Sequence, residues 1–262
     1  MSDQQRTITT ETPYVMPVPV AFSGAAGEDI TVYTKAPLTG PKGTGSVEIL
    51  GMTTDIPSAT AIFTLNGRPI WGSDQIPLAM NFGKPGSPKP IIWLERPLTI
   101  SSGERIRGDL IDVAGDGPGR LFFIGRQKGS DAPRVVLPSD EVGEPEDLVI
   151  DSAFTNTADE RPSRATSPIL DDHFLLYGLH TNLDNATVRL FGIDGIPWSE
   201  DPVNVWAIAG RAADALTTLR FHRPYLIPAK YKIAAEFING AAPDVDAAGQ
   251  LFLKGLRFPV SA

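Results

Sequence analysis

The stretch FTLNGRPIW at residues 63–71 recurs as LFGIDGIPW at residues 190–198, and this recurrence decides how the fold is interpreted. Around it, residues 51–106 can be laid on residues 178–233 without a gap, at an offset of 127. Eleven of the 56 aligned positions are identical, and they include a tryptophan and an Arg-Pro pair. Solenoid units and propeller blades run only about 20–50 residues. The pattern therefore indicates a small domain that has been copied whole.

The composition around the repeat favours an all-β fold. The chain has 25 glycines and 24 prolines, spread between short apolar runs. Several runs alternate, as ATAIFTL (59–65) does, which is the pattern of a strand with one buried face. We expect two tandem antiparallel β-sandwich domains, of the jelly-roll type, related by internal duplication. An immunoglobulin-like strand order stays open, because the cysteine marker of that fold is missing from this chain.

Turn and charge content divide the chain into four segments. The beginning is polar and Thr-rich, and a charged stretch with three prolines separates the two copies. We expect an N-terminal arm at 1–16, a first sandwich at 17–128, a linker at 129–147 and a second sandwich at 148–262. Two Pro-containing stretches, 35–46 and 155–168, are expected to form long loops.

Two segments of the second copy are less clear in their local structure. VNVWAIA (203–209) alternates like a strand and is expected to be one. RAADALTTL (211–219) is Ala-rich and is a helix candidate. Its threonines leave open a loop that runs into a strand.

The bulk composition excludes several classes of protein. There is no cysteine, so disulfides, thiolate metal sites and a cysteine nucleophile are excluded. No apolar run approaches the 18 or so residues that span a bilayer, and the first residues lack the apolar core of a signal peptide. The net charge is −8 and the basic residues are not clustered, so we expect no direct nucleic-acid partner.

The sequence contains no recognisable catalytic set. The three histidines, His173, His180 and His222, form no metal-binding motif, and the first two are expected on opposite faces of one strand. No nucleophile elbow or phosphate-binding loop appears. Acidic pairs such as Asp171-Asp172 are expected among 31 acidic residues. We therefore expect no enzyme, no catalytic residue, no cofactor and no bound metal.

The residues that the copies share are candidates for structural or interface roles. Trp71 and Trp198 each follow a tight turn, and we favour packing for them over a sugar-stacking platform. The Arg-Pro pairs come after apolar strands, where proline ends a ladder and arginine is free for an ion pair or an intersubunit contact. Trp93, Phe122 and Phe123 are expected in the core. The candidates are Trp71, Trp198, Arg96, Pro97, Arg223, Pro224, Asn66, Gly67, Asp194 and Gly195.

The two turn dipeptides lie one residue out of the common register. Asn66-Gly67 and Asp194-Gly195 both favour positive φ, as tight turns require. At an offset of 127, Asn66 would instead meet Ile193. One copy is therefore expected to carry a bulge or a slip at this turn.

With these units in view, the chain resembles the double jelly-roll major coat proteins of icosahedral bacteriophages, in their compact form. The residues that carry the resemblance are the strand and Asx-Gly turn units FTLNGRPIW (63–71) and LFGIDGIPW (190–198). Long tower-forming loops of the larger family members have no room here. The resemblance implies a structural capsid protein of the virion, made in the host cytoplasm.

The resemblance also implies partners. It implies homotrimers that tile a shell as pseudo-hexamers, contacts with other virion proteins, and membrane contact only through an underlying virion membrane. A capsid decoration or minor capsid protein and a tail or spike protein are alternatives. A carbohydrate-binding or host-attachment module that uses Trp71 and Trp198 is a third.

Overall fold

The computed structural model describes thirteen stretches of the chain, which include every strand and helix named below. They are residues 5–22, 28–34, 45–71, 75–83, 91–114, 119–128, 134–138, 143–152, 163–183, 186–199, 201–211, 219–239 and 249–260. Within them the chain is all-β, with several antiparallel sheets and two helices of four residues each. The chain divides into two compact units. We call Tyr14–Ser130 the N-unit, and Asp131–Ala262 together with Met1–Pro13 the C-unit.

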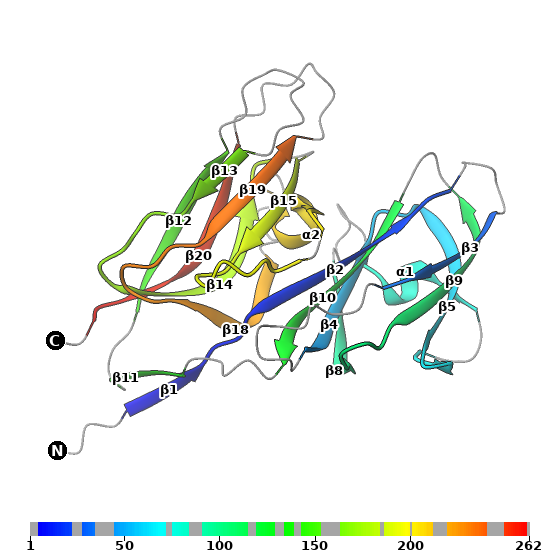
Figure 1. The fold of residues 1–262 in the computed structure, drawn as a ribbon, viewed down its shortest axis with the longest axis horizontal. Coiled ribbons are helices and arrows are strands. Elements are labelled where there is room, and N and C mark those ends of the chain that lie inside the picture. Colours follow the sequence, from blue (N-terminus) through cyan, green and yellow to red (C-terminus); the bar gives the residue numbers. More distant parts are fainter. Residues whose placement is uncertain are drawn as a thin grey trace. The chain divides into compact units, whose positions relative to one another are not determined.

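The N-unit consists of two sheets and a short helix (Figure 1). The first sheet has the order β2-β10-β4-β8, with β2 (Pro13–Val20), β10 (Gly119–Lys128), β4 (Ser46–Thr54) and β8 (Ile92–Ile100). In the second, β9 lies between β3 and β5, and β5 also pairs β6 and β7. Its strands are β3 (Glu28–Tyr33), β9 (Ile106–Ala114), β5 (Ser58–Leu65), β6 (Arg68–Pro69) and β7 (Ile76–Pro77). The helix α1 (Leu78–Asn81) follows β7 directly.

The C-unit has the same kind of construction. In its first sheet β20 lies between β12 and β14, and β14 also pairs β17 and β18. These strands are β12 (Glu144–Ser152), β20 (Gly249–Phe258), β14 (His173–Thr181), β17 (Gly210–Arg211) and β18 (Leu219–Ile227). The second sheet has the order β13-β19-β15-β16, with β13 (Ser163–Thr166), β19 (Ala234–Asn239), β15 (Ala186–Phe191) and β16 (Val203–Asn204). The helix α2 (Val205–Ile208) follows β16.

A third sheet of the C-unit joins the start of the chain to its middle. β1 (Gln5–Thr9) pairs antiparallel with β11 (Arg134–Pro138), and the two lie side by side in Figure 1. The first thirteen residues therefore belong to the C-unit, although the N-unit follows them directly in the chain.

Strand order agrees between the two units. When the N-unit strands β2, β3, β4, β5, β7, β8, β9 and β10 are ranked along the chain, with the two-residue strand β6 left out, the two sheets read 1-8-3-6 and 2-7-4-5. The C-unit gives the same two orders with β12, β13, β14, β15, β16, β18, β19 and β20, when the two-residue strand β17 is left out. The helices also correspond, since α1 and α2 begin 127 residues apart, at Leu78 and Val205.

The pairing register agrees as well. In both units the ladder between the third and sixth strands breaks at an irregularity and then resumes. Each N-unit residue that pairs directly before or after the break has its counterpart in the C-unit 127 residues further on. The matched pairs are Ile49↔Leu98 and Gly51↔Trp93 in the N-unit, and Leu176↔Tyr225 and Gly178↔Arg220 in the C-unit.

Each unit encloses its own apolar core, because alternate side chains on facing strands point inward. In the N-unit, Phe63, Phe82 and Phe123 form the centre, with ring centroids 5.3, 5.6 and 6.3 Å apart. In the C-unit, Phe174 and Phe237 are fully buried. A core inside each sandwich is the usual solution for two sheets that are each apolar on one face.

Three expectations from the sequence about local structure are wrong. The stretch 203–209 is not a strand, because only its first two residues pair and the next four form α2. The expected loop 155–168 contains a strand, β13. Trp93 is not in the core, because its side chain is 46% exposed on β8.

The expected arm and the expected linker both contain strands. The expected arm includes β1 and the beginning of β2, and the expected linker includes β11 and the beginning of β12. The helix candidate 211–219 lies largely outside the described residues, as does most of the expected loop 35–46. Arg211 ends β17 and Leu219 begins β18.

Candidate functional site

The turn of the N-unit repeat is a two-residue hairpin loop. Asn66 and Gly67 both have positive φ, of 53° and 75°, and Leu65 pairs with Arg68 across them. This is the geometry that fits the twist of a tight hairpin. The Asn66 side-chain amide also donates to Glu104, at 2.6 Å, which ties the turn to the start of β9.

The turn of the C-unit repeat is one residue longer. The Gly195 amide donates to the Gly192 carbonyl and the Gly192 amide donates to the Ile196 carbonyl, at 3.0 and 2.9 Å. Gly195 has a φ of 76°, and the Asp194 carboxylate accepts the Ile196 amide at 2.9 Å. A three-residue loop that ends in a left-handed glycine is the next commonest hairpin connection. This extra residue explains why the two dipeptides are out of register.

The two repeated tryptophans pack against aromatic residues of their own units. Trp71 is half-buried, with its ring edge-on to Phe63 at 5.3 Å between centroids. Trp198 is only 4% exposed and lies edge-on to Tyr225 at 5.1 Å. Burial closes the Trp198 ring to a sugar, and Trp71 packs against the core of its own unit.

A small polar site lies beside Trp198. The hydroxyl of Tyr225 accepts the Ile193 amide at 2.9 Å, and burial raises the pKa of Tyr225 to about 12. The Trp198 Nε1–H is buried and has no hydrogen-bond partner among the described residues. The hydroxyl stabilises the longer turn, because it satisfies an amide that the hairpin leaves free.

The Arg-Pro pairs lie inside edge strands. Both pairs fall in the irregular stretch where four residues of β8 or β18 face one residue of the neighbouring strand. The ladder resumes directly after each proline, at Leu98 and Tyr225, so proline interrupts these strands and does not end them. Proline is tolerated at such bulges because they need no ladder N–H.

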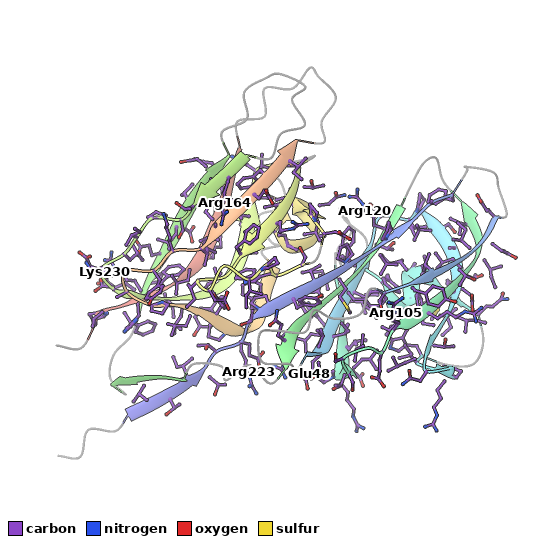
Figure 2. The ribbon with its side chains drawn as sticks, in the orientation of Figure 1. Glu48, Arg105, Arg120, Arg164, Arg223 and Lys230 are labelled. Atoms are coloured by element: carbon purple, nitrogen blue, oxygen red, sulfur yellow. The ribbon has the colours of Figure 1, made fainter. Side chains whose placement is uncertain are left out.

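The β18 edge in the C-unit is covered by the start of the chain. The Glu11 amide donates to the Pro224 carbonyl at 3.0 Å, and the Glu11 carboxylate pairs with the Arg223 guanidinium at 2.9 Å. Ile8 is buried nearby, in a cluster with Leu175, Leu226 and Phe258. Figure 2 labels Arg223 at this edge, next to the path of the N-terminal segment. The start of the chain thus acts as a strap over β18.

The matching β8 edge of the N-unit is open in the described structure. Arg96 and Pro97 are both exposed, and no described residue pairs with either of them. β8 is the last strand of its sheet. Trp93 lies on the same strand over Gly51, where an added Cβ would approach its ring to 2.7 Å. The repeated Arg-Pro pair therefore has two different surroundings.

All ten candidate residues lie in the described part of the chain, and the sequence did not predict the strap. The structure groups Arg223 and Pro224 with Glu11, and it keeps Arg96 and Pro97 apart from the turn at Asn66. A usable signal was present, because Ile8 and Glu11 are an apolar and an acidic residue in an otherwise threonine-rich segment.

The histidines and acidic groups remain separate from one another. The His173 Nδ1 accepts the Ala229 amide at 3.2 Å, and desolvation lowers the pKa of His180, which lies against Phe252. Burial raises the pKa of Asp55, whose carboxylate accepts the Arg120 amide. Within the part of the chain that the structure describes, no three such side chains are grouped as metal ligands.

Comparisons with known proteins give no relative. No protein-family model, curated protein or solved structure matches the chain. Among the described residues, no helix is long and apolar enough to cross a membrane.

Proposed function

We propose that this chain is a structural virion protein, a capsid subunit that forms pseudo-hexameric trimers in the icosahedral shell of a bacteriophage. One observation carries the proposal: the chain contains two β-sandwiches with the same strand order and the same broken register. It is supported by the resemblance of the turn units to those of double jelly-roll coat proteins.

The strand order favours two jelly rolls, related by duplication, over immunoglobulin-like domains. In a jelly roll, eight strands fold as two Greek keys into two sheets, and the orders 1-8-3-6 and 2-7-4-5 are what that winding produces. An immunoglobulin constant-type domain instead has its first and second strands in one sheet. Here β2 and β3 are in different sheets, as are β12 and β13.

The shared residues support an architectural role. They form turns, bulges and core contacts. Closed symmetric oligomers are the usual assemblies of soluble chains. Three copies of a chain with two similar blocks supply six blocks around one axis, which is suited to tiling a flat facet.

A sugar-binding role receives less support from the tryptophans. Trp198 is buried, which closes its ring to a sugar, and Trp71 is half-buried against the core of its own unit. A tryptophan after a turn that packs on its own core is the ordinary structural use of the residue.

Light scattering of the purified chain over a range of concentrations tests the assembly part of the proposal. We expect a mass of three chains, and larger assemblies when virion components are added. A stable monomer at high concentration, with no association on virion components, would overturn the proposed function.

Copy number separates the capsid role from the other virion roles. We expect hundreds of copies of the chain in each purified particle, measured by quantitative mass spectrometry against the other virion proteins. A dozen copies or fewer would move the assignment to a vertex, tail or spike protein. A count well below that of another shell protein would indicate a decoration or minor capsid protein.

A further inference from the structure

We propose that the outer edge of β8, at Trp93, Arg96 and Pro97, docks an extended, carboxylate-bearing segment of a second copy of this chain. The inference rests on the proposed function in one respect, which is that copies of the chain meet side by side. It adds the surface at which they meet and the chemistry of the contact.

The C-unit shows how such an edge is filled. At β18, the chain's own Glu11 donates its amide to the Pro224 carbonyl and places its carboxylate 2.9 Å from Arg223. Glu11 is well covered there, with 12% of its side chain exposed. Arginine and a proline carbonyl at a bulge thus form a two-point receptor for an extended acidic residue.

The N-unit repeats this receptor without its occupant. Arg96 and Pro97 occupy the same positions in the same break of register, 127 residues earlier. No described residue supplies the carboxylate or the amide. An edge strand with free carbonyls is a site for pairing with another chain, and here the bulge and the proline restrict pairing to a short contact.

The occupant differs from the strap of the C-unit. Ile8 packs on an apolar face formed by Leu175 and Leu256. The matching face of the N-unit instead carries the Glu48–Arg126 ion pair, at 2.6 Å, on the same two strands. An apolar anchor like Ile8 has no place there, and the exposed ring of Trp93 supplies the apolar contact on this edge.

Charge favours a second copy as the source of the carboxylate. The chain has 31 acidic residues against 23 lysines and arginines, so its own surface offers many acidic groups to an unpaired arginine. The filled edge is also a contact of this chain with itself. A contact between unlike surfaces of two copies closes into a ring when its rotation allows, as a trimer requires.

Charge reversal at two exposed arginines, Arg96 on β8 and Arg68 on β6, gives a matched comparison. We expect Arg96→Glu to raise the concentration needed for half-association by about tenfold or more, because it repels the docked carboxylate. Arg96→Lys should restore most of the association. Arg68→Glu makes the same charge change at an exposed position of β6, in the other sheet, and should leave the association concentration unchanged.

Photo-crosslinking identifies the docked segment directly. The chain has no cysteine, so Glu95→Cys, at an exposed position of β8, takes a single benzophenone label. We expect crosslinks between two chains that map to an acidic stretch of the second copy. Met80→Cys, exposed on α1, is the labelled control and should give few such crosslinks.

The outcomes separate this inference from the proposed function. If the wild-type chain assembles and Arg96→Glu assembles equally well, or Glu95→Cys gives no crosslink between chains, the docking edge is wrong and the capsid role stands. An equal loss in Arg68→Glu would trace the effect to charge in general and would also overturn the docking edge. A wild-type chain that stays monomeric overturns both.

Discussion

Thr54 and Thr181 show how closely single residues correspond between the two units. Each hydroxyl donates to a carbonyl of the last strand, Arg120 or Gln250, at 2.8 and 2.9 Å. Each also accepts the amide two residues on, at 3.1 and 3.0 Å. A threonine hydroxyl that both donates and accepts at a strand end stabilises the following turn, because it satisfies backbone groups that the ladder leaves without a partner.

Truncation of the buried Trp198 should destabilise the C-unit. We expect Trp198→Ala to lower the free energy of unfolding by about 3–5 kcal/mol, because it empties a fully packed position. Trp71→Ala should cost less, since Trp71 is only half-buried. Chemical denaturation of both variants measures this difference, and equal costs would contradict the packing role argued for Trp198.

Tyr225 should make the protein sensitive to alkali. Its pKa is about 12 in the folded chain and about 10 in an unfolded one. As the pH rises, the unfolded chain loses this proton first, so the stabilisation is complete below pH 10 and is lost between about pH 10 and 12. The full loss corresponds to about 2–3 kcal/mol. Denaturation at several pH values should show that Tyr225→Phe loses less unfolding free energy between pH 10 and 12 than the wild type. An equal loss in both proteins would show that Tyr225 is not the group responsible.

At the scale of the element, two glycines make the repeated bulge possible. Gly125 on β10 and Gly255 on β20 lie beside the irregularity in the third strand of each unit. A Cβ on either would collide with a backbone carbonyl, that of Glu48 or of Leu175. Neither has positive φ, so close approach of the backbones is what requires glycine here.

Alanine at either glycine should therefore destabilise one unit. We expect Gly125→Ala and Gly255→Ala each to cost about 1–3 kcal/mol, as forced overpacking does. Ser102→Ala, at an exposed turn position, is the control and should be neutral. Thermal melting with a fluorescence readout measures the stability of the two glycine variants and of the control. Melting temperatures like that of the control would mean that the strands can move apart at little cost.

The sequence predicted elements whose signals are local. The strand β5 alternates between buried and more exposed residues, and the Asn66-Gly67 turn has its own chemistry. The helix α2 could not be predicted, because four residues hold barely one turn and VNVWAIA reads as a strand. The β1–β11 pairing and the Glu11–Arg223 contact join residues far apart in the chain, and no local pattern records such a partner.

At the scale of the whole molecule, the path of the chain links the two units. The chain begins in the C-unit, builds the N-unit from Tyr14 to Ser130 and then returns to the C-unit. The first thirteen residues are therefore part of the C-unit fold, held by β1 pairing, by Ile8 in an apolar cluster and by the Glu11–Arg223 pair. Loss of these contacts should weaken the C-unit and spare the N-unit.

Ile8→Asp in the full-length chain tests this division. The substitution places a charge in the cluster with Leu226 and Phe258, so the strap should detach and β18 should lose its cover. We expect amide hydrogen exchange to speed up by about tenfold or more in β11 and β18, while β4 and β10 of the N-unit keep their protection. Thr9→Asp adds the same charge at the exposed neighbouring position and should leave both units unchanged. The core of the N-unit is made of N-unit residues, so local detachment of the strap should not expose its strands. Equally faster amide exchange in both units would therefore show that the start of the chain stabilises the whole molecule cooperatively.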